Sequence, residues 1–297
     1  MKRQEKLYLG IDGGGSKCKV LLANEQGQAL ATGMSGPANP NQGLDLAINS
    51  IMDATEQALH QAGFASSMVD QLVVGAGLAG VNLPKYRAML DQWDHPFAQF
   101  HITTDLQIAC LGAHDGEDGA VIIAGTGSIG MAHVDGNSHE LGGYGFSVGD
   151  QGSGAWMGVT AIKQTLQAMD GLLPRTELVD QVLEFTQCRT AQELAQQMAN
   201  LKPSAYAKLA PLVIERAAAK DTLALDIVLN GADYISRLAR KLLTYNPPRL
   251  SMIGGLAPRI QSWLDEDVRV RVEPAKQPPE IGAILFAQQQ ALVSEKA

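Results

Sequence analysis

Asp12 is followed by three glycines, a serine and a lysine, and this run carries the residue types best suited to chemistry. Consecutive glycines have no side chain to bury, so we expect them to let the backbone turn and bring its N–H groups against an anion. In that setting Asp12 suits a Mg²⁺ ion, while Ser16 and Lys17 suit phosphate oxygens. The order is not that of a Walker A loop, in which the lysine directly follows a glycine. An ordinary glycine-rich hairpin is the alternative. The predicted cradle consists of Asp12, Gly13, Gly14, Gly15, Ser16 and Lys17.

Asp105 is the second candidate, because it lies between an apolar segment, 100–104, and a helical pattern, 106–111. A carboxylate at the C-terminal end of a strand in an open sheet lies at the crevice where ligands bind. Aspartate is also a preferred N-cap residue, and one residue can serve both purposes. The local sequence therefore allows a functional carboxylate, a helix cap, or both.

A third candidate is the glycine-dense segment 142–154, which precedes a helical pattern that starts near residue 155. Crowded glycines allow close approach of the backbone to a ligand, and Asp150 among them suits recognition of a hydroxyl group. A flexible loop is the alternative interpretation.

The chain repeats one layout, which indicates how these loops are positioned. Residues 7–27 and 120–137 each have the pattern strand, glycine turn, strand and turn, which predicts an antiparallel hairpin in each half. Residues 72–79 and 250–257 form a second matching pair, in which an apolar strand ends in glycines and Leu-Ala. The expected fold is α/β, with two related halves whose glycine loops face a central cleft.

Helical periodicity fills much of the remaining chain, and its apolar stripes are expected to be core. The expected helices cover 44–59, 177–185, 191–199, 205–219 and 222–245. The expected domains are residues 1–115 with 281–297, and residues 116–280 with a helical insertion.

The pattern GxGxxG occurs at 75–80 and at 125–130. The first copy follows a strand, and Asp105 falls where a ribose-binding carboxylate could lie, so a dinucleotide-dependent oxidoreductase is a second class of function. Two features oppose it. Pro84 falls where the dinucleotide-binding helix should be under way, and the second copy continues into a strand. The bare motif is also weakly specific.

Composition and charge limit the class of partner. The 297 residues carry a net charge of −8, and no segment concentrates lysine and arginine, so we expect no nucleic-acid partner. Cys18, Cys110 and Cys188 are far apart and predict neither a disulfide framework nor a zinc or iron–sulfur site. The apolar run before Asp12 is too short for a signal peptide or a membrane span. We expect a cytoplasmic protein without a membrane partner.

Together these motifs resemble those of the amino-sugar kinases, which are N-acetylglucosamine kinase and bacterial glucosamine kinase. They belong to the BadF/BadG/BcrA/BcrD ATPase-type branch of the sugar kinase/Hsp70/actin superfamily. The similar segments are 12–16, 104–105, 124–128, 142–145, 149–153 and 254–255. The resemblance implies two ribonuclease H-like, actin-like ATPase domains, with a central cleft between them that closes over ATP, Mg²⁺ and a small amino sugar. Members of this family often dimerise, so the resemblance allows a homodimer, while the sequence itself leaves the oligomeric state open.

The resemblance also implies roles for single residues. Asp105 would be the general base that accepts the proton of the sugar 6-hydroxyl, and Asp12 would hold Mg²⁺ through water. The cofactor-binding residues that it implies beyond the first cradle are Thr126, Gly127, Gly254 and Gly255. The sugar-binding residues that it implies are Asn39, Asp105, Ser128, Gly143, Tyr144, Gly145 and Asp150.

The leading hypothesis is therefore ATP-dependent phosphorylation of the 6-hydroxyl of an amino sugar. N-acetylglucosamine is favoured because Asp150 is the one acid near the glycine-rich turn, whereas a protonated amine would need a second carboxylate. Glucosamine is the alternative. A dehydratase-activating ATPase would need paired cysteines for an iron–sulfur cluster, and a sugar-responsive repressor would need a DNA-binding helix-turn-helix. The cysteine positions and the acidic charge argue against these two classes.

Overall fold

The structure is a computed structural model and describes residues 6–294. The chain divides into two compact units, which are Met1–Gly119 with Ala275–Ala297, and Ala120–Pro274. Each unit is built around one five-stranded sheet. No helix in the described part of the chain is both long enough and apolar enough to cross a membrane.

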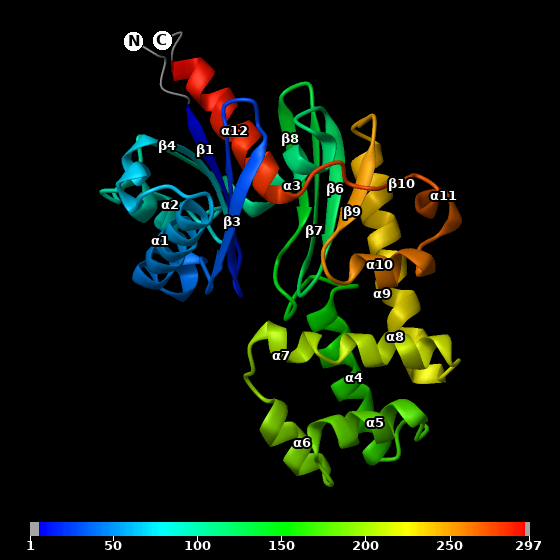
Figure 1. Ribbon diagram of the computed structural model, residues 1–297. Coiled ribbons are helices and arrows are strands. Elements are labelled where there is room, and N and C mark those ends of the chain that lie inside the picture. The colour runs from blue at the N-terminus through cyan, green and yellow to red at the C-terminus, as the bar shows by residue number, and fades with distance from the viewer. Residues whose placement is uncertain (1–5, 295–297) are drawn as a thin grey trace, which may run out of the picture. The chain divides into compact units, whose positions relative to one another are not determined.

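The sheet of the first unit has the strand order β3-β2-β1-β4-β5 (Figure 1). β2 pairs antiparallel with both β1 and β3, which confirms the predicted N-terminal hairpin. β4 and β5 continue the sheet parallel to β1, so the C-terminal ends of these three strands share one edge. The bounds are β1 (Leu7–Gly13), β2 (Cys18–Ala23), β3 (Ala29–Ser35), β4 (Leu72–Leu78) and β5 (Gln99–Thr104).

Helices cover both faces of this sheet. The apolar stripe of α1 packs against Leu9 and Ile11 of β1. Because side chains alternate along a strand, Tyr8 points to the opposite face, where it packs with Ile284 of α12. α12 and α3 lie side by side on that second face (Figure 1). The helices are α1 (Leu44–Gln61), α2 (Pro84–Asp91), α3 (Asp105–His114) and α12 (Pro279–Ser294), with 3-10 turns at Pro40–Gln42 and Ser66–Gln71.

The return of the chain to the first unit begins before α12. Backbone N–H groups of Lys276 and Gln277 donate to the carbonyls of Ala113 and Gly112 at the end of α3, at 3.0 and 3.1 Å. These bonds fasten residues 275–278 to the first unit, which is why its second segment starts at Ala275 rather than at the expected 281.

The second unit repeats the strand order of the first. Its sheet runs β8-β7-β6-β9-β10, with β7 and β8 antiparallel and with β9 parallel to both β6 and β10. The two sheets thus share the order 3-2-1-4-5 of a ribonuclease H-like fold, and the predicted duplication is confirmed. The bounds are β6 (Gly119–Ala124), β7 (Ser128–Val134), β8 (Asn137–Gly142), β9 (Leu250–Ile253) and β10 (Val272–Glu273).

Most of the helices belong to the second unit, as the sequence indicated. The single helix expected over 205–219 is wrong, because two helices, α7 and α8, replace it. Pro211 has no N–H group, so a continuous helix could not form its hydrogen bond there. The bounds are α4 (Gly154–Met169), α5 (Glu177–Thr186), α6 (Ala191–Met198), α7 (Pro203–Ala207), α8 (Ala210–Ala218), α9 (Thr222–Leu243), α10 (Ala257–Ile260) and α11 (Glu266–Arg269), with a 3-10 turn at Gln261–Trp263.

Candidate active site

One half of the candidate site lies at the C-terminal ends of β1, β4 and β5 in the first unit. The register places Gly13, Leu78 and Thr104 side by side across these strands. Asp12 and Asp105 therefore stand at the same sheet edge, two strands apart, which is roughly 10 Å at the usual strand spacing. The structure thus brings together two carboxylates that are far apart in the sequence.

The loop after β3 is fastened to the same edge. Ala38 donates a backbone hydrogen bond to the Gly14 carbonyl at 3.0 Å. The next residue, Asn39, accepts a hydrogen bond from the Asn41 backbone through Oδ1 at 2.8 Å, and the Tyr86 hydroxyl donates to Asn41 Oδ1 at 2.6 Å. Asn39 therefore lies beside the glycine turn, and its Oδ1 is already used within the loop.

Gly13 departs from the expectation that the glycines act only through the backbone. A Cβ at Gly13 would overlap the Leu78 side chain and lie 3.0 Å from the Ala38 Cβ. This glycine is therefore required by close packing, and that part of the sequence interpretation is wrong.

The rest of the turn is open. The Gly14 N–H donates to the Lys17 carbonyl at 2.9 Å and closes the turn, so this amide is used internally. Gly15, Ser16 and Lys17 are exposed, and no acceptor for the backbone amides of Gly15 and Ser16 occurs among residues 6–294. Anion-binding capacity therefore resides in the second half of the predicted cradle.

Asp12 lies near charged side chains that come from other parts of the sequence. It is directly opposite Lys19 of β2 in the sheet register. The pKa of Asp12 is raised to about 6, first by burial and then by the negative charges of Glu280 and Asp105, against the opposing effect of Lys17 and Lys19. An ionised Asp12 is thus disfavoured by its surroundings, and a bound cation would relieve this penalty.

Glu280, at the start of α12, is a residue that the sequence analysis missed. Only 1% of its surface is exposed. Its Oε1 accepts an ion-paired hydrogen bond from Lys19 Nζ at 2.7 Å, while Oε2 has no partner among the described residues. A buried carboxylate oxygen without a partner is unfavourable.

The two carboxylates fit a hydrated cation better than a directly ligated one. No group of three His, Cys, Asp or Glu side chains in residues 6–294 is placed to hold a metal ion. Mg²⁺ usually keeps several waters and takes one or two carboxylates together with substrate phosphates. Asp12, with Glu280 behind it, meets that description.

The N-cap interpretation of Asp105 is wrong, because Thr104 is the cap of α3. Its side-chain oxygen accepts from the Gln107 backbone at 3.1 Å. Asp105 is the first helical residue, and its Oδ1 accepts from the Leu106 backbone at 3.0 Å. The half-buried carboxylate therefore lies in the first turn of a helix, where the helix dipole favours negative charge.

The other half of the candidate site lies in the second unit, at the turn Gly125-Thr126-Gly127 between β6 and β7. Backbone bonds from Gly154 to the Gly125 carbonyl (2.8 Å) and from Ala155 to the Thr126 carbonyl (3.1 Å) fasten this turn to the start of α4. Thr126 remains exposed, so its hydroxyl and backbone amide point to solvent on a fixed turn.

The loop after β9 lies against this turn. Gly254 has a φ of +103°, and a Cβ there would overlap the Ala124 carbonyl, so only glycine fits. The Leu256 backbone donates to the same carbonyl at 3.0 Å. Gly254 and Gly255 are exposed, and together with the Thr126 turn they present two adjacent strips of bare backbone.

Asp150 connects the Thr126 turn to the glycine-dense segment. One of its carboxylate oxygens accepts from the Gly145 backbone at 3.1 Å, and the Ser128 backbone also donates to it. A Cβ on Gly127 would lie only 2.8 Å from the Oδ2 atom of Asp150. Burial raises the pKa of Asp150, and these two hydrogen bonds oppose the shift. Ser128 is held as well, because its hydroxyl donates to the Gln151 carbonyl at 3.0 Å.

The glycine-dense segment turns sharply at three of its glycines. Gly142, Gly143 and Gly145 all have positive φ, which glycine adopts readily. Tyr144 between them is 76% exposed. Tyr234 of α9 is a neighbour that the sequence analysis missed: burial raises its pKa, and the negative charge of Asp150 adds to the shift.

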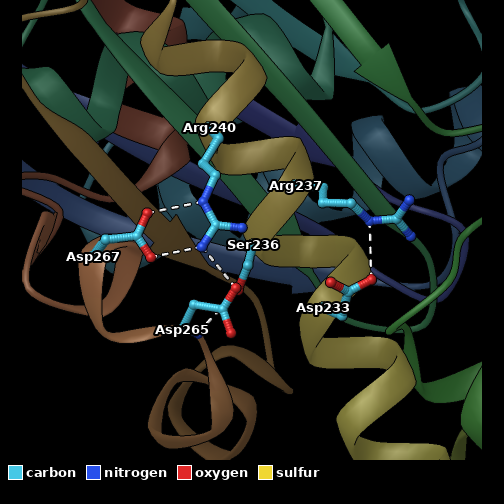
Figure 2. A network of polar contacts seen from close by, with 6 residues as sticks. All are labelled: Asp233, Ser236, Arg237, Arg240, Asp265 and Asp267. Carbon is cyan, nitrogen blue, oxygen red and sulfur yellow. Dashed lines mark hydrogen bonds and ion pairs between the residues drawn. The ribbon is translucent and has the colours of Figure 1, made fainter.

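A polar network fixes the segment that follows Gly254 and Gly255 to helix α9. Figure 2 shows Arg240 of α9 bound to Asp267 through Nε and Nη2, at 2.8 and 2.6 Å, and to Asp265 at 2.7 Å. The Asp265 backbone also donates to the Ser236 hydroxyl at 3.1 Å. These bonds tie α11 and its preceding loop to the helix that packs on the second sheet.

The two ribonuclease H-like sheets, each with a glycine turn in its first hairpin, define the class of two-unit, actin-like ATPases. The chain belongs to the BadF/BadG/BcrA/BcrD ATPase family, whose model matches residues 9–287. Membership in this family confirms the predicted fold class and the use of ATP.

Relatives in this class are sugar kinases by name. Glucosamine kinase GspK of Vibrio cholerae is 36% identical over 280 residues, which cover 94% of this chain and 95% of the relative. N-acetyl-D-glucosamine kinase of Dictyostelium discoideum is 28% identical over 80% of this chain and 81% of the relative. A crystal structure from Chromobacterium violaceum, provisionally named an N-acetylglucosamine kinase, superposes with a TM-score of 0.90 at 31% identity, covering 95% of this chain and 99% of that one. The predicted class, an ATP-dependent sugar kinase, is confirmed.

The oxidoreductase alternative is wrong. Gly75 and Gly77 of the first GxGxxG match lie inside β4 and do not form a phosphate-binding turn. A Cβ at Gly75 would overlap the Ala283 backbone of α12, and one at Gly77 would overlap Ile108 of α3. These glycines let two helices pack closely on the sheet. The second match begins in the turn Gly125-Thr126-Gly127 and continues into strand β7 rather than into a helix, as the sequence indicated.

Proposed function

We propose that this protein transfers the γ-phosphoryl group of ATP to the 6-hydroxyl of an amino sugar. The observation that carries the proposal is the meeting of Asp12, the Asn39 loop and Asp105 at one edge of the first sheet. Phosphoryl transfer needs charge neutralisation, a positioned acceptor and a proton acceptor, and these three elements supply one each.

ATP is assigned to the two glycine turns and to the loop after β9. In the first unit, the exposed amides of Gly15 and Ser16 and the Lys17 side chain are phosphate donors, and Asp12 holds Mg²⁺ through water. In the second unit, Thr126 and Gly127 bind phosphate oxygens from the opposite domain. The bare backbone of Gly254 and Gly255 lines the nucleoside pocket.

The sugar is assigned to the remaining polar groups. Asp105 accepts the proton of the 6-hydroxyl, a role that fits an ionised carboxylate at a strand end. The residues proposed to hold the sugar are Asn39, Ser128, Gly143, Tyr144, Gly145 and Asp150.

Two amino sugars are candidates. N-acetylglucosamine is favoured by Asp150, whose carboxylate is already bound by two backbone amides and so offers little to a protonated amine. Glucosamine is favoured by the similarity to a glucosamine kinase at 36% identity. The cytoplasmic location stays a prediction from the sequence, as does the homodimer that the resemblance allows.

A coupled assay of ADP release tests the proposal and separates the two acceptors. We expect kcat/KM on an amino sugar to exceed that on glucose by at least tenfold, with N-acetylmannosamine as a further comparison. A kcat/KM tenfold higher for glucosamine than for N-acetylglucosamine, about 1.4 kcal/mol of transition-state binding, would assign the free amine. ADP release that no sugar stimulates would contradict the proposal.

A further inference from the structure

We propose that Glu280 is the second carboxylate of the cation site at Asp12, where the Lys19 charge offsets part of the negative charge. The inference deepens the proposed function, because it rests on the assignment of Mg²⁺ to Asp12. It adds a residue from α12, which lies more than 260 positions further along the chain than Asp12.

The first support is that only one of the two buried carboxylate oxygens of Glu280 has a hydrogen-bond partner among the described residues. Glu280 is 1% exposed, and Lys19 Nζ occupies only its Oε1, at 2.7 Å. Oε2 is buried without a partner among the described residues. A buried ion pair stabilises a protein only when the remaining lone pairs of its carboxylate are also satisfied. The unpartnered Oε2 therefore indicates that Glu280 has a further binding partner.

The second support is the shared face of the three charged side chains. Gly10 and Asp12 are two residues apart on β1 and therefore face the same side of the sheet. The backbone carbonyl of Glu280 occupies the space that a Cβ on Gly10 would take. Lys19 pairs directly with Asp12 in the register, so its side chain is on this face as well.

The third support is the balance of charge. Asp12 and Glu280 together carry two negative charges, and Lys19 neutralises one, which leaves a net charge of −1 for a divalent cation and its phosphate ligands. The ion would keep its waters, because no three carboxylates within residues 6–294 are grouped closely enough to ligate it directly.

The competing explanation is a purely structural ion pair that fastens α12 to β2. The two explanations differ in what the partners do. If the pair is only structural, then Glu280→Gln and Lys19→Met should have the same consequence. If Glu280 serves the cation, loss of its charge weakens cation binding, whereas loss of the opposing Lys19 charge does not.

Mn²⁺ is the probe, and the EPR signal of the free aqua ion is the readout, measured on the full chain alone and with saturating ADP. We expect Glu280→Gln to weaken Mn²⁺ binding at least fivefold and Lys19→Met to leave it unchanged or tighten it. Glu177→Gln, which makes the same chemical change at the start of α5 in the other unit, should match the wild type. Thermal unfolding verifies that each variant is folded.

The inference is overturned if Glu280→Gln binds Mn²⁺ within twofold of the wild type, if Lys19→Met weakens binding as much as Glu280→Gln, or if the wild type binds no Mn²⁺. Should Glu280→Gln fail to fold, Glu280→Asp keeps the charge, retracts it by one methylene and is expected to weaken binding by a smaller factor. The readout needs no sugar. A chain that loses Mn²⁺ affinity in Glu280→Gln but phosphorylates no amino sugar would support this inference and contradict the proposed function.

Discussion

The two half-sites share a hairpin but differ in their chemistry. In the first unit β1 ends in Asp12 and Gly13, and the turn is surrounded by the charges of Lys17, Lys19, Glu280 and Asp105. In the second unit β6 ends in Ile123 and Ala124, and its turn lies against Asp150, which backbone amides hold. The two units thus share the same hairpin, but charged side chains surround the turn of the first unit, whereas hydroxyl groups and exposed backbone surround that of the second.

The glycines at matching places show the same divergence. Gly77 of β4 and Gly255 after β9 occupy equivalent places in the repeated pattern. Gly77 lies within the strand, where Ile108 of α3 takes the space of its Cβ. Gly255 follows the end of β9, and beyond its chain neighbours no atom of residues 6–294 lies within 4 Å of the place that a Cβ would take. One glycine permits helix packing and the other forms the exposed loop assigned to the nucleoside.

The largest effect is expected at the charged half-site. Asp105→Asn removes the proposed general base and should lower kcat by about 10²-fold or more, while ATP still binds. Asp115→Asn at the other end of α3 is the matched control, because asparagine tolerates the left-handed backbone of that residue (φ 58°). Near-normal turnover of Asp105→Asn would show that Asp105 is not the general base, and would contradict the catalytic role given to the charged half-site.

The next effect separates the two glycine turns. Gly127→Ala puts a Cβ 2.8 Å from Asp150 Oδ2, so Asp150 must move, and KM for the sugar should rise about tenfold, or 1.4 kcal/mol. At Gly14 the nearest atom to a Cβ is the Lys17 carbonyl oxygen at 3.5 Å, so Gly14→Ala should fold normally and alter only KM for ATP. Steady-state kinetics in both substrates measures the split. Equal effects of the two variants on KM for the sugar would contradict the assignment of different substrates to the two turns.

A smaller effect concerns stability and pH. The pKa of Asp12 is raised from 3.8 in the unfolded chain to about 6 in the folded protein. Between these two pH values the folded protein therefore keeps a proton on Asp12 that the unfolded chain has lost. The resulting penalty is present above pH 6 and disappears as the pH falls to about 4. Asp12→Asn should therefore raise the free energy of unfolding at pH 8 by about 1–3 kcal/mol, although it abolishes activity, and should have no effect near pH 4.

Urea denaturation in the presence of a chelator, at pH 8 and pH 4, measures this difference. Asp53→Asn on the exposed surface of α1 is the control for removal of a carboxylate. A stability difference for Asp12→Asn that is the same at both pH values would show that Asp12 carries no strained charge.

The smallest effect concerns the surface network of the second unit. Arg240→Met removes three hydrogen bonds to Asp265 and Asp267 (Figure 2) and should lower Tm slightly, more at low salt than at high salt. Arg237→Met breaks only a single ion pair with Asp233 one turn away, so its effect on Tm should be smaller still. Thermal unfolding at two salt concentrations compares the variants, and a larger loss for Arg237→Met would contradict the network.

Much of the fold could be predicted from the sequence because its signals are local. Alternating apolar residues around the two glycine turns indicated both hairpins, and the stripes at 44–59 and 222–245 indicated α1 and α9 nearly to their ends. The error at 205–219 came from giving helical periodicity more weight than Pro211, which was visible in the sequence.

The charged surroundings of Asp12 could not be predicted in this way. Glu280 looks like an ordinary acidic residue in the first turn of a helix, and only the packing of α12 against Gly10 places it behind Asp12. The role of Gly13 was misjudged for the same reason, since its neighbours Leu78 and Ala38 come from other strands and loops. Long-range packing decides both cases.

The product of the reaction tests the central claim most directly. The protein is incubated with ATP, Mg²⁺ and either N-acetylglucosamine or glucosamine, and ³¹P–¹H correlation NMR identifies the atom that receives the phosphoryl group. The account predicts a phosphomonoester whose phosphorus couples to the two protons on C6, formed in step with ADP. Inorganic phosphate as the only new phosphorus species besides ADP, or a phosphoryl group on any other position of the sugar, would contradict it.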